Sequence, residues 1–105
     1  MRIIGIDPGY AIVGFGVIDY ERPKFGVIDY GAITTAAETE FNTRLMEIYD
    51  DVCSIFDRYK PESMAIERLY FTTNQKTAIA VAEARGIVLL AAKQRGIEIF
   101  EYTPL

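Results

Sequence analysis

Histidine is absent from this sequence of 105 residues, and cysteine occurs once, at Cys53. Without histidine there can be no Ser-His triad, no Cys-His dyad and no histidine-ligated zinc. A lone cysteine cannot form an intramolecular disulfide, which fits a reducing compartment and leads us to expect a cytoplasmic protein. Because Cys53 falls within a helical pattern, we expect it to be a small residue of the core.

Long apolar runs and an excess of positive charge are also missing. No apolar run approaches the roughly 18 residues of a transmembrane helix, and the N-terminus lacks a signal-peptide pattern. The net charge of −4, taken alone, argues against a protein that binds nucleic acid, because such proteins usually carry a basic excess. Half of the residues are hydrophobic and a quarter are charged, which is typical of a globular protein, and the length predicts one domain over residues 1–105.

What the sequence does contain is an alternation of strand-like and helix-like segments. Periodicity predicts strands at 2–7, 11–20, 25–34, 63–67 and 97–102. One helix is expected between the N-cap Thr39 and Lys60-Pro61, and a second at 74–94, with Gly96 at its C′ position. Short connections predict an antiparallel meander of the first three strands, and right-handed crossovers make the later strands parallel. The order βββαβαβ therefore predicts an α/β fold with a mixed five-stranded sheet.

The second predicted helix is rich in alanine and apolar around most of its circumference. Its apolar residues are at 78–82, 84 and 87–92. Such a helix needs cover on more than one side. Gly86 within it costs about 1 kcal/mol relative to alanine, so we expect close packing at this position.

Two of the predicted strands end on an acid, Asp7 and Glu67. If both strands are central and parallel, their carboxylates project from the carboxyl edge of the sheet, where α/β folds place their sites. Two acids held together repel each other unless a proton or a cation lies between them, and their hard oxygens suit Mg²⁺ or Mn²⁺. Carboxylates around two such ions, about 3.5–4 Å apart, are common in nucleases.

A structural interpretation of both acids stays open. Asp before Pro-Gly is good turn chemistry, so Asp7 could simply begin a loop, and Arg68 could pair with Glu67. The other aspartates at strand ends or on a polar helix face are interpreted as solvated surface: Asp19, Asp29, Asp50, Asp51 and Asp57.

Three segments resemble the RuvC family of Holliday-junction resolvases. They are IIGIDPGYAIVGFGVI, MAIERLYFTTNQKTAIAVAEARGIVLLAA and IEIFEYTPL, and the resemblance covers the whole chain with consistent spacing. It implies a ribonuclease-H-like fold and an Mg²⁺-dependent endonuclease, for which Mn²⁺ can substitute. Such an enzyme nicks four-way DNA junctions symmetrically in recombination and repair. The first two catalytic acids and metal ligands of the family fall on Asp7 and Glu67.

The resemblance also implies partners. The aromatic residue that meets the opened junction falls on Tyr70, with Phe71 beside it, and stacking on a base contributes about 1–3 kcal/mol. Arg68, Asn74 and Lys76 join them as implied DNA-binding residues. The long alanine-rich helix would lie at a homodimer interface, and a branch-migration helicase complex is a further implied partner.

The sequence departs from the family pattern at its end. The family chain continues with a lysine-bearing segment and a final helix that carries two more acids, whereas this sequence ends at Leu105. We therefore expect an incomplete domain with an uncovered sheet face and half of the acidic site, which cuts DNA poorly or not at all. The alternatives are a non-catalytic dimerisation or DNA-binding module of the same fold and, less favoured, an actin-like phosphotransferase fragment. The latter is disfavoured because no Gly-Thr-rich turn follows Asp7.

Overall fold

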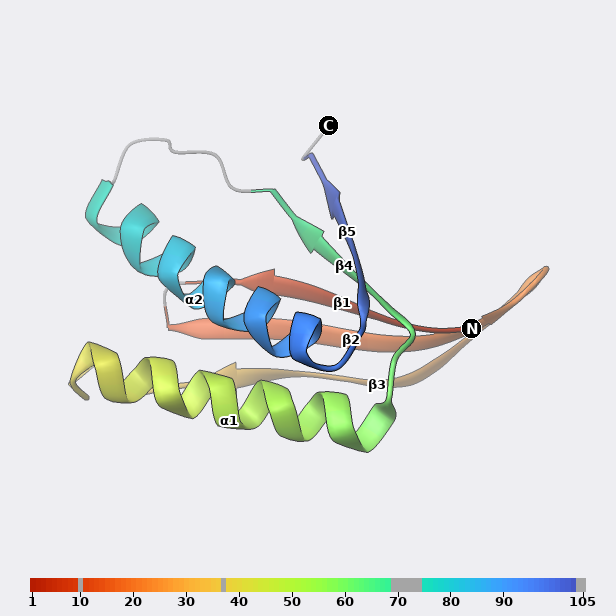
Figure 1. Ribbon diagram of the computed structural model, residues 1–105, viewed down its shortest axis with the longest axis horizontal. Helices are drawn as coiled ribbons and strands as arrows, with labels where there is room; N and C mark the ends of the chain where they lie inside the picture. Colours follow the sequence, from red (N-terminus) through yellow and green to blue (C-terminus); the bar gives the residue numbers. More distant parts are fainter. Residues whose placement is uncertain (10, 37, 69–74, 104–105) are drawn as a thin grey trace.

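The structure, a computed structural model, describes residues 1–9, 11–36, 38–68 and 75–103, with the side chains of Gln75 and Lys76 left out. Within these ranges, five strands and two helices follow one another in the expected order βββαβαβ. The strands are β1 (Arg2–Pro8), β2 (Ile12–Glu21), β3 (Lys24–Thr34), β4 (Ser63–Glu67) and β5 (Glu98–Tyr102), and the helices are α1 (Phe41–Tyr59) and α2 (Gln75–Gln94). Both helices lie on one side of the sheet (Figure 1).

The sheet has the strand order β3-β2-β1-β4-β5. β2 pairs antiparallel with both β1 and β3, whereas β4 pairs in parallel with both β1 and β5. This pairing confirms the predicted meander and the parallel strands after each helix. β1 is thus the central strand, and β4 lies next to it in a register that places Ile6 opposite Ile66.

Alternation along the central strands sends one set of side chains toward the helices. Ile4 and Ile6 of β1 and Met64 and Ile66 of β4 are at most 2% exposed. They belong to one core cluster with side chains of both helices, and Cys53 packs against it half-buried, as expected. The helix residues of the cluster are Ile48, Val52 and Phe56 of α1 and Ala84, Val88, Ala91 and Ala92 of α2. Full burial of such an aliphatic or aromatic side chain contributes roughly 1.5–3 kcal/mol, so this layer stabilises the fold.

The opposite face of the sheet carries large apolar side chains in contact with solvent. The register places Phe100 and Tyr102 of β5 beside Ala65 and Glu67 of β4, on the face turned away from the core. The large side chains on this face that are at least 50% exposed are Ile12, Phe25, Val27, Tyr30, Phe100 and Tyr102. No helix among the described residues covers them.

The helix ends agree with the sequence in one place and differ in another. Gly96 has a φ of 68°, the left-handed conformation expected at the C′ position. The N-cap of α1, however, is Glu40, without a side-chain capping bond, so the prediction of Thr39 is wrong. The reason is that Thr39 belongs to a preceding turn, in which its N–H donates to the carbonyl of Ala36 at 3.1 Å.

Gly86 is where the expectation of close packing fails. A Cβ built at Gly86 meets no described atom within 4 Å. Ala84 and Val88 form the core face of α2, and at 100° per residue the position between them lies on the outer side. Ile79 and Leu90, 56% and 50% exposed, leave α2 with apolar surface that has no cover in the described chain.

Neither helix is long and apolar enough to cross a membrane.

Candidate functional site

Asp7 and Glu67 lie side by side at the carboxyl edge of the sheet. Each directly follows the paired residues Ile6 and Ile66 of the parallel strands β1 and β4, and neighbouring strands lie roughly 4.8 Å apart. Because Ile6 and Ile66 point into the core, alternation turns both acids to the open face. Asp7 is exposed and Glu67 is half-buried. The structure thus brings together the two acids that the sequence singled out.

β2 leaves room beside Asp7. Gly14 is the residue opposite Asp7 in the antiparallel pair, and a Cβ there would lie 3.9 Å from the Cβ of Asp7. Glycine therefore keeps a side chain out of the space next to the carboxylate. β1 continues through Pro8, which pairs with Val13, so Asp7 lies within the strand and does not begin a loop.

No basic side chain of the described residues neutralises either carboxylate. Among the described residues, no hydrogen bond or ion pair reaches the side-chain oxygens of Asp7 or Glu67. Arg68 instead donates from Nε to Oε2 of Glu101 at 3.2 Å. The interpretation in which Arg68 pairs with Glu67 is therefore wrong, because consecutive strand residues face opposite sides of a sheet.

Glu101 binds the basic side chains on the helix side of the sheet. Its Oε1 lies 3.4 Å from Nη2 of Arg85, and its Oε2 accepts the bond from Arg68. Arg85 first, and then Arg68, lower the pKa of the Glu101 carboxyl below its usual range. Arg85 also donates from Nε to the backbone carbonyl of Glu67 at 3.2 Å. The positive charge next to the end of β4 is thus held on the helix face, away from the two acids.

Sequence reasoning missed Glu101 and its contact with Arg85. A signal was present in β5, where Ile97 and Ile99 pack in or against the core and alternation brings Glu101 to the same side. An acid on a core-facing position needs a basic or hydrogen-bonding partner. The arginine of the long helix supplies it.

Three of the aspartates interpreted as solvated surface have partners; the prediction is wrong for the half-buried Asp19 and Asp29, whereas Asp57 is exposed as predicted. The pairs are Asp19 with Arg2, Asp57 with Arg95, and Asp29 with the hydroxyl of Tyr59. In each case the partner lowers the pKa of the aspartate's carboxyl. The partners come from other elements of the fold, which the local sequence pattern does not reveal. Asp50 and Asp51 are exposed, as expected.

Most of the implied DNA contacts cannot be placed in this site. Tyr70, Phe71 and Asn74 lie outside the described residues, and Lys76 begins α2 with a side chain that is not described. Arg68 is described, and its side chain is 62% exposed. In the described part of the chain no group of three or more acids or cysteines is placed to hold a metal ion, so Asp7 and Glu67 stand as a pair.

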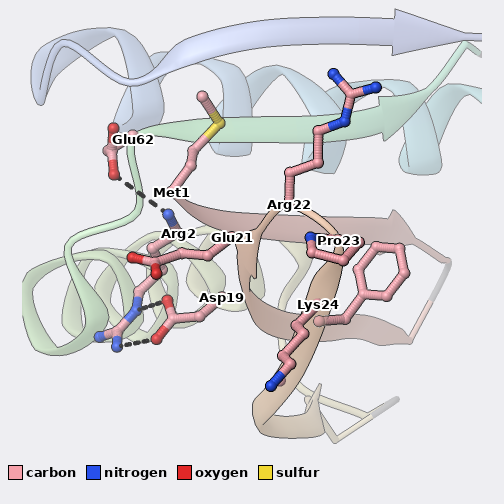
Figure 2. A pocket seen from close by; sticks show the side chains of 10 residues that line it. Met1, Arg2, Asp19, Glu21, Arg22, Pro23, Lys24 and Glu62 are labelled. Carbon is pink, nitrogen blue, oxygen red and sulfur yellow. Dashed lines mark hydrogen bonds and ion pairs between the residues drawn. The ribbon is translucent and has the colours of Figure 1, made fainter.

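A hollow of about 750 Å³ lies at the other end of β1. Figure 2 shows its walls, which come from the amino end of β1, the turn between β2 and β3, and Glu62. Glu62 accepts a hydrogen bond from the backbone N–H of Arg2 at 3.2 Å. Arg22 and Lys24 point in different directions in this view (Figure 2), so they do not converge on one group. The hollow is lined by neither candidate acid, and we do not regard it as the functional site.

Known proteins resemble this chain in both sequence and fold. The chain is 51% identical over 105 residues to the crossover junction endodeoxyribonuclease RuvC of Fusobacterium nucleatum and 50% identical over 105 residues to that of Ruminiclostridium cellulolyticum. All of this chain is covered in both cases, but only 55% and 63% of those two proteins. The solved structure of Thermus thermophilus RuvC in complex with Holliday junction substrate matches with a TM-score of 0.92 at 30% identity, over 99% of this chain and 66% of that one.

The mixed sheet, with its two helices and its strand order, defines a ribonuclease-H-like domain. The model of the family "Crossover junction endodeoxyribonuclease RuvC" matches residues 3–105. The chain therefore belongs to the RuvC family, and it spans less than two thirds of the length of these curated relatives.

Proposed function

We propose that this chain forms part of a Holliday-junction resolvase, a structure-specific endonuclease that nicks four-way DNA junctions symmetrically in recombination and repair. The observation that carries the proposal is the pair Asp7 and Glu67, two carboxylates on adjacent parallel strands of a RuvC-family chain that no described basic side chain neutralises. The Thermus thermophilus relative was solved with a Holliday junction substrate, which supports the same class of substrate here.

Nucleases of this family depend on a divalent metal ion, and the acids at the site fit such an ion. Asp7 and Glu67 offer only carboxylate oxygens, which suit Mg²⁺, with Mn²⁺ as a substitute. Both would act as ligands, and Glu67 would also orient the attacking water. Mg²⁺ bound there would activate that water and stabilise the leaving oxygen. A site with only these two ligands would hold the ion weakly and cut DNA slowly.

The proposed DNA surface begins at the end of β4. Arg68 directly follows the strand with an exposed side chain, and we assign it a phosphate contact. Tyr70 and Phe71 would supply stacking on an unpaired base, and Asn74 and Lys76 further polar contacts. Because the net charge is −4, we expect weak binding with a shallow dependence on salt.

A homodimer through α2 fits this role, because symmetric nicking of two strands requires two sites. The exposed Ile79 and Leu90 would be covered at such an interface, which would remove apolar surface from water. A branch-migration helicase complex is a further proposed partner of the dimer.

A second candidate function is a non-catalytic dimerisation or DNA-binding module of the same fold. One observation favours it: the part of the chain that the structure describes holds no third acid beside Asp7 and Glu67.

Binding and cleavage of a synthetic four-way junction in Mg²⁺ distinguish the two candidates. For the resolvase, we expect the chain to prefer the junction over a linear duplex of the same sequence, and any nicking to disappear in Asp7→Asn. Asp50→Asn, at an exposed aspartate outside the site, is the control and should change neither result. Equal affinity for junction and duplex would contradict the resolvase. A dimer that binds neither DNA nor Mg²⁺ would favour a dimerisation module, and robust cutting would overturn the expectation of poor activity.

A further inference from the structure

The peptide group between Glu67 and Arg68 is held from two sides. Its N–H, which belongs to Arg68, donates to the carbonyl of Tyr102 in β5 at 2.7 Å. Its carbonyl, which belongs to Glu67, points to the other side of β4 because the peptide is trans, and it accepts from Nε of Arg85 at 3.2 Å. Arg85 comes from α2, and its side chain is 13% exposed. A largely buried side chain of the helix thus reaches the last peptide of the strand that carries Glu67.

Pro8 explains why this carbonyl needs a side-chain donor. The parallel register of β1 and β4 brings Pro8 level with Arg68, so the strand donor for the Glu67 carbonyl would be the N–H of residue 8. Proline has no N–H, and the ladder between the two strands therefore ends there. A carbonyl left without a donor inside the fold would destabilise it. Arg85 supplies the missing hydrogen bond.

Glu101 holds Arg85 in this position. Nη2 of Arg85 lies 3.4 Å from Oε1 of Glu101, as an ion pair without hydrogen-bond geometry, since Nη2 is buried and makes no hydrogen bond in the described structure. The other carboxylate oxygen of Glu101 binds Arg68. Glu101 therefore holds the side chains of both Arg85 and Arg68 on the helix face, while the N–H of the peptide stays bonded to β5. Together these contacts limit the direction in which the Glu67 side chain leaves the open face.

We propose that Arg85 is a positioning residue for Glu67. It replaces the strand donor that is missing at Pro8 and holds the last peptide of β4 so that the Glu67 carboxylate stands beside Asp7. The inference rests on the proposed role of these two acids as metal ligands. Loss of an outer partner of a metal ligand typically weakens metal binding about 10–100-fold.

Arg85→Met in the whole chain tests the inference with two measurements. In NMR hydrogen exchange without metal, the Arg68 amide should exchange up to about tenfold faster, because its peptide loses one of two hydrogen bonds, while the amide of Val88 keeps its protection. In a Mn²⁺ titration followed by water-proton relaxation, the dissociation constant should rise about tenfold or more. In a Glu67→Gln background the same substitution should cause no further loss, because the two act through one ligand.

Two further variants separate positioning from general stability. Arg95→Met is the matched control, because Arg95 is likewise a mostly buried arginine, with 26% of its side chain exposed, and pairs with an acid, Asp57, at 2.7 Å. It should change neither measurement. Pro8→Ala restores an N–H at residue 8 and should return protection to the Arg68 amide in the Arg85→Met background. Arg85→Lys keeps the charge beside Glu101 but cannot present the planar guanidinium. Arg85→Lys should therefore show the same changes in amide exchange and in Mn²⁺ affinity, and it serves as the test if Arg85→Met fails to fold.

The outcomes are distinguishable from a failure of the proposed function. If Mn²⁺ binding does not depend on Asp7, the metal proposal fails and amide exchange alone decides the role of Arg85. Unchanged exchange at Arg68 in the Arg85 variants, or an equal effect in Arg95→Met, overturns the inference.

Discussion

The two ends of β1 hold acids in opposite ways. At the amino end, Arg2 donates to both carboxylate oxygens of Asp19 at 2.8 and 2.9 Å and to the carbonyl of Tyr59 at 3.1 Å. At the carboxyl end, the carboxylates of Asp7 and Glu67 have no hydrogen bond or ion pair to any described residue. An acid with a basic partner contributes to the fold, whereas adjacent acids without one favour a cation from solution.

The two faces of the sheet produce this difference. Arg68 and Arg85 lie next to the end of β4, but both turn to the helix face, where Glu101 binds them. The acids stand on the open face, so these guanidinium groups do not neutralise them. At this end of β1, arginine supports the backbone of the site and leaves the negative charge of the two acids available to a cation.

Asp7 and Asp19 should differ in metal binding. Asp7→Asn should weaken Mn²⁺ binding by about tenfold or more, because an amide replaces one of two charged ligands. Asp19→Asn should leave the affinity unchanged, since Asp19 is committed to Arg2. Water-proton relaxation in a Mn²⁺ titration gives both dissociation constants. Equal constants in the two variants would show that the unpaired acids are not the metal site.

The fold and the two acids were predictable because their signals are local. The run Ile3–Ile6 is apolar or glycine and is followed by Asp7, and an apolar run that ends on an acid can be recognised without any knowledge of its neighbours. The connections then dictate that β1 and β4 run parallel. That relation is enough to bring Asp7 and Glu67 to one edge of the sheet.

The partners of the charged groups were not predictable because they depend on faces and on distant elements. Arg68 follows Glu67 in the sequence but points to the other side of the sheet, toward Glu101. Asp19 looks like the solvated end of a strand until the antiparallel register puts it opposite Arg2. Alternation in the sequence shows which residues of a strand share a face. The partner of each charged side chain, however, depends on which strands pair and in which register.

The amino end of β1 should account for part of the acid sensitivity of the fold. Arg2 lowers the pKa of the Asp19 carboxyl. The stability from this pair is therefore fully present above the unfolded-state pKa of about 3.9, and it is lost as the pH falls through the lower pKa of the folded state. Arg2→Met should make the free energy of unfolding decline less steeply below about pH 4. Urea denaturation at a series of pH values measures the slope, and a slope as steep as that of the wild type would show that the pair is not linked to folding.

The smallest expected effect concerns the thermodynamic stability of the metal-free chain. Asp7→Asn should change the free energy of unfolding by less than about 0.5 kcal/mol, because the carboxylate has no partner among the described residues. Asp19→Asn should lower the midpoint of thermal unfolding modestly, because a charged pair is replaced by a weaker, uncharged contact. Calorimetry in the presence of a chelator measures both. A larger loss for Asp7→Asn would mean that Asp7 supports the fold. An acid whose removal costs metal binding but no stability is one that the fold holds in place for a ligand.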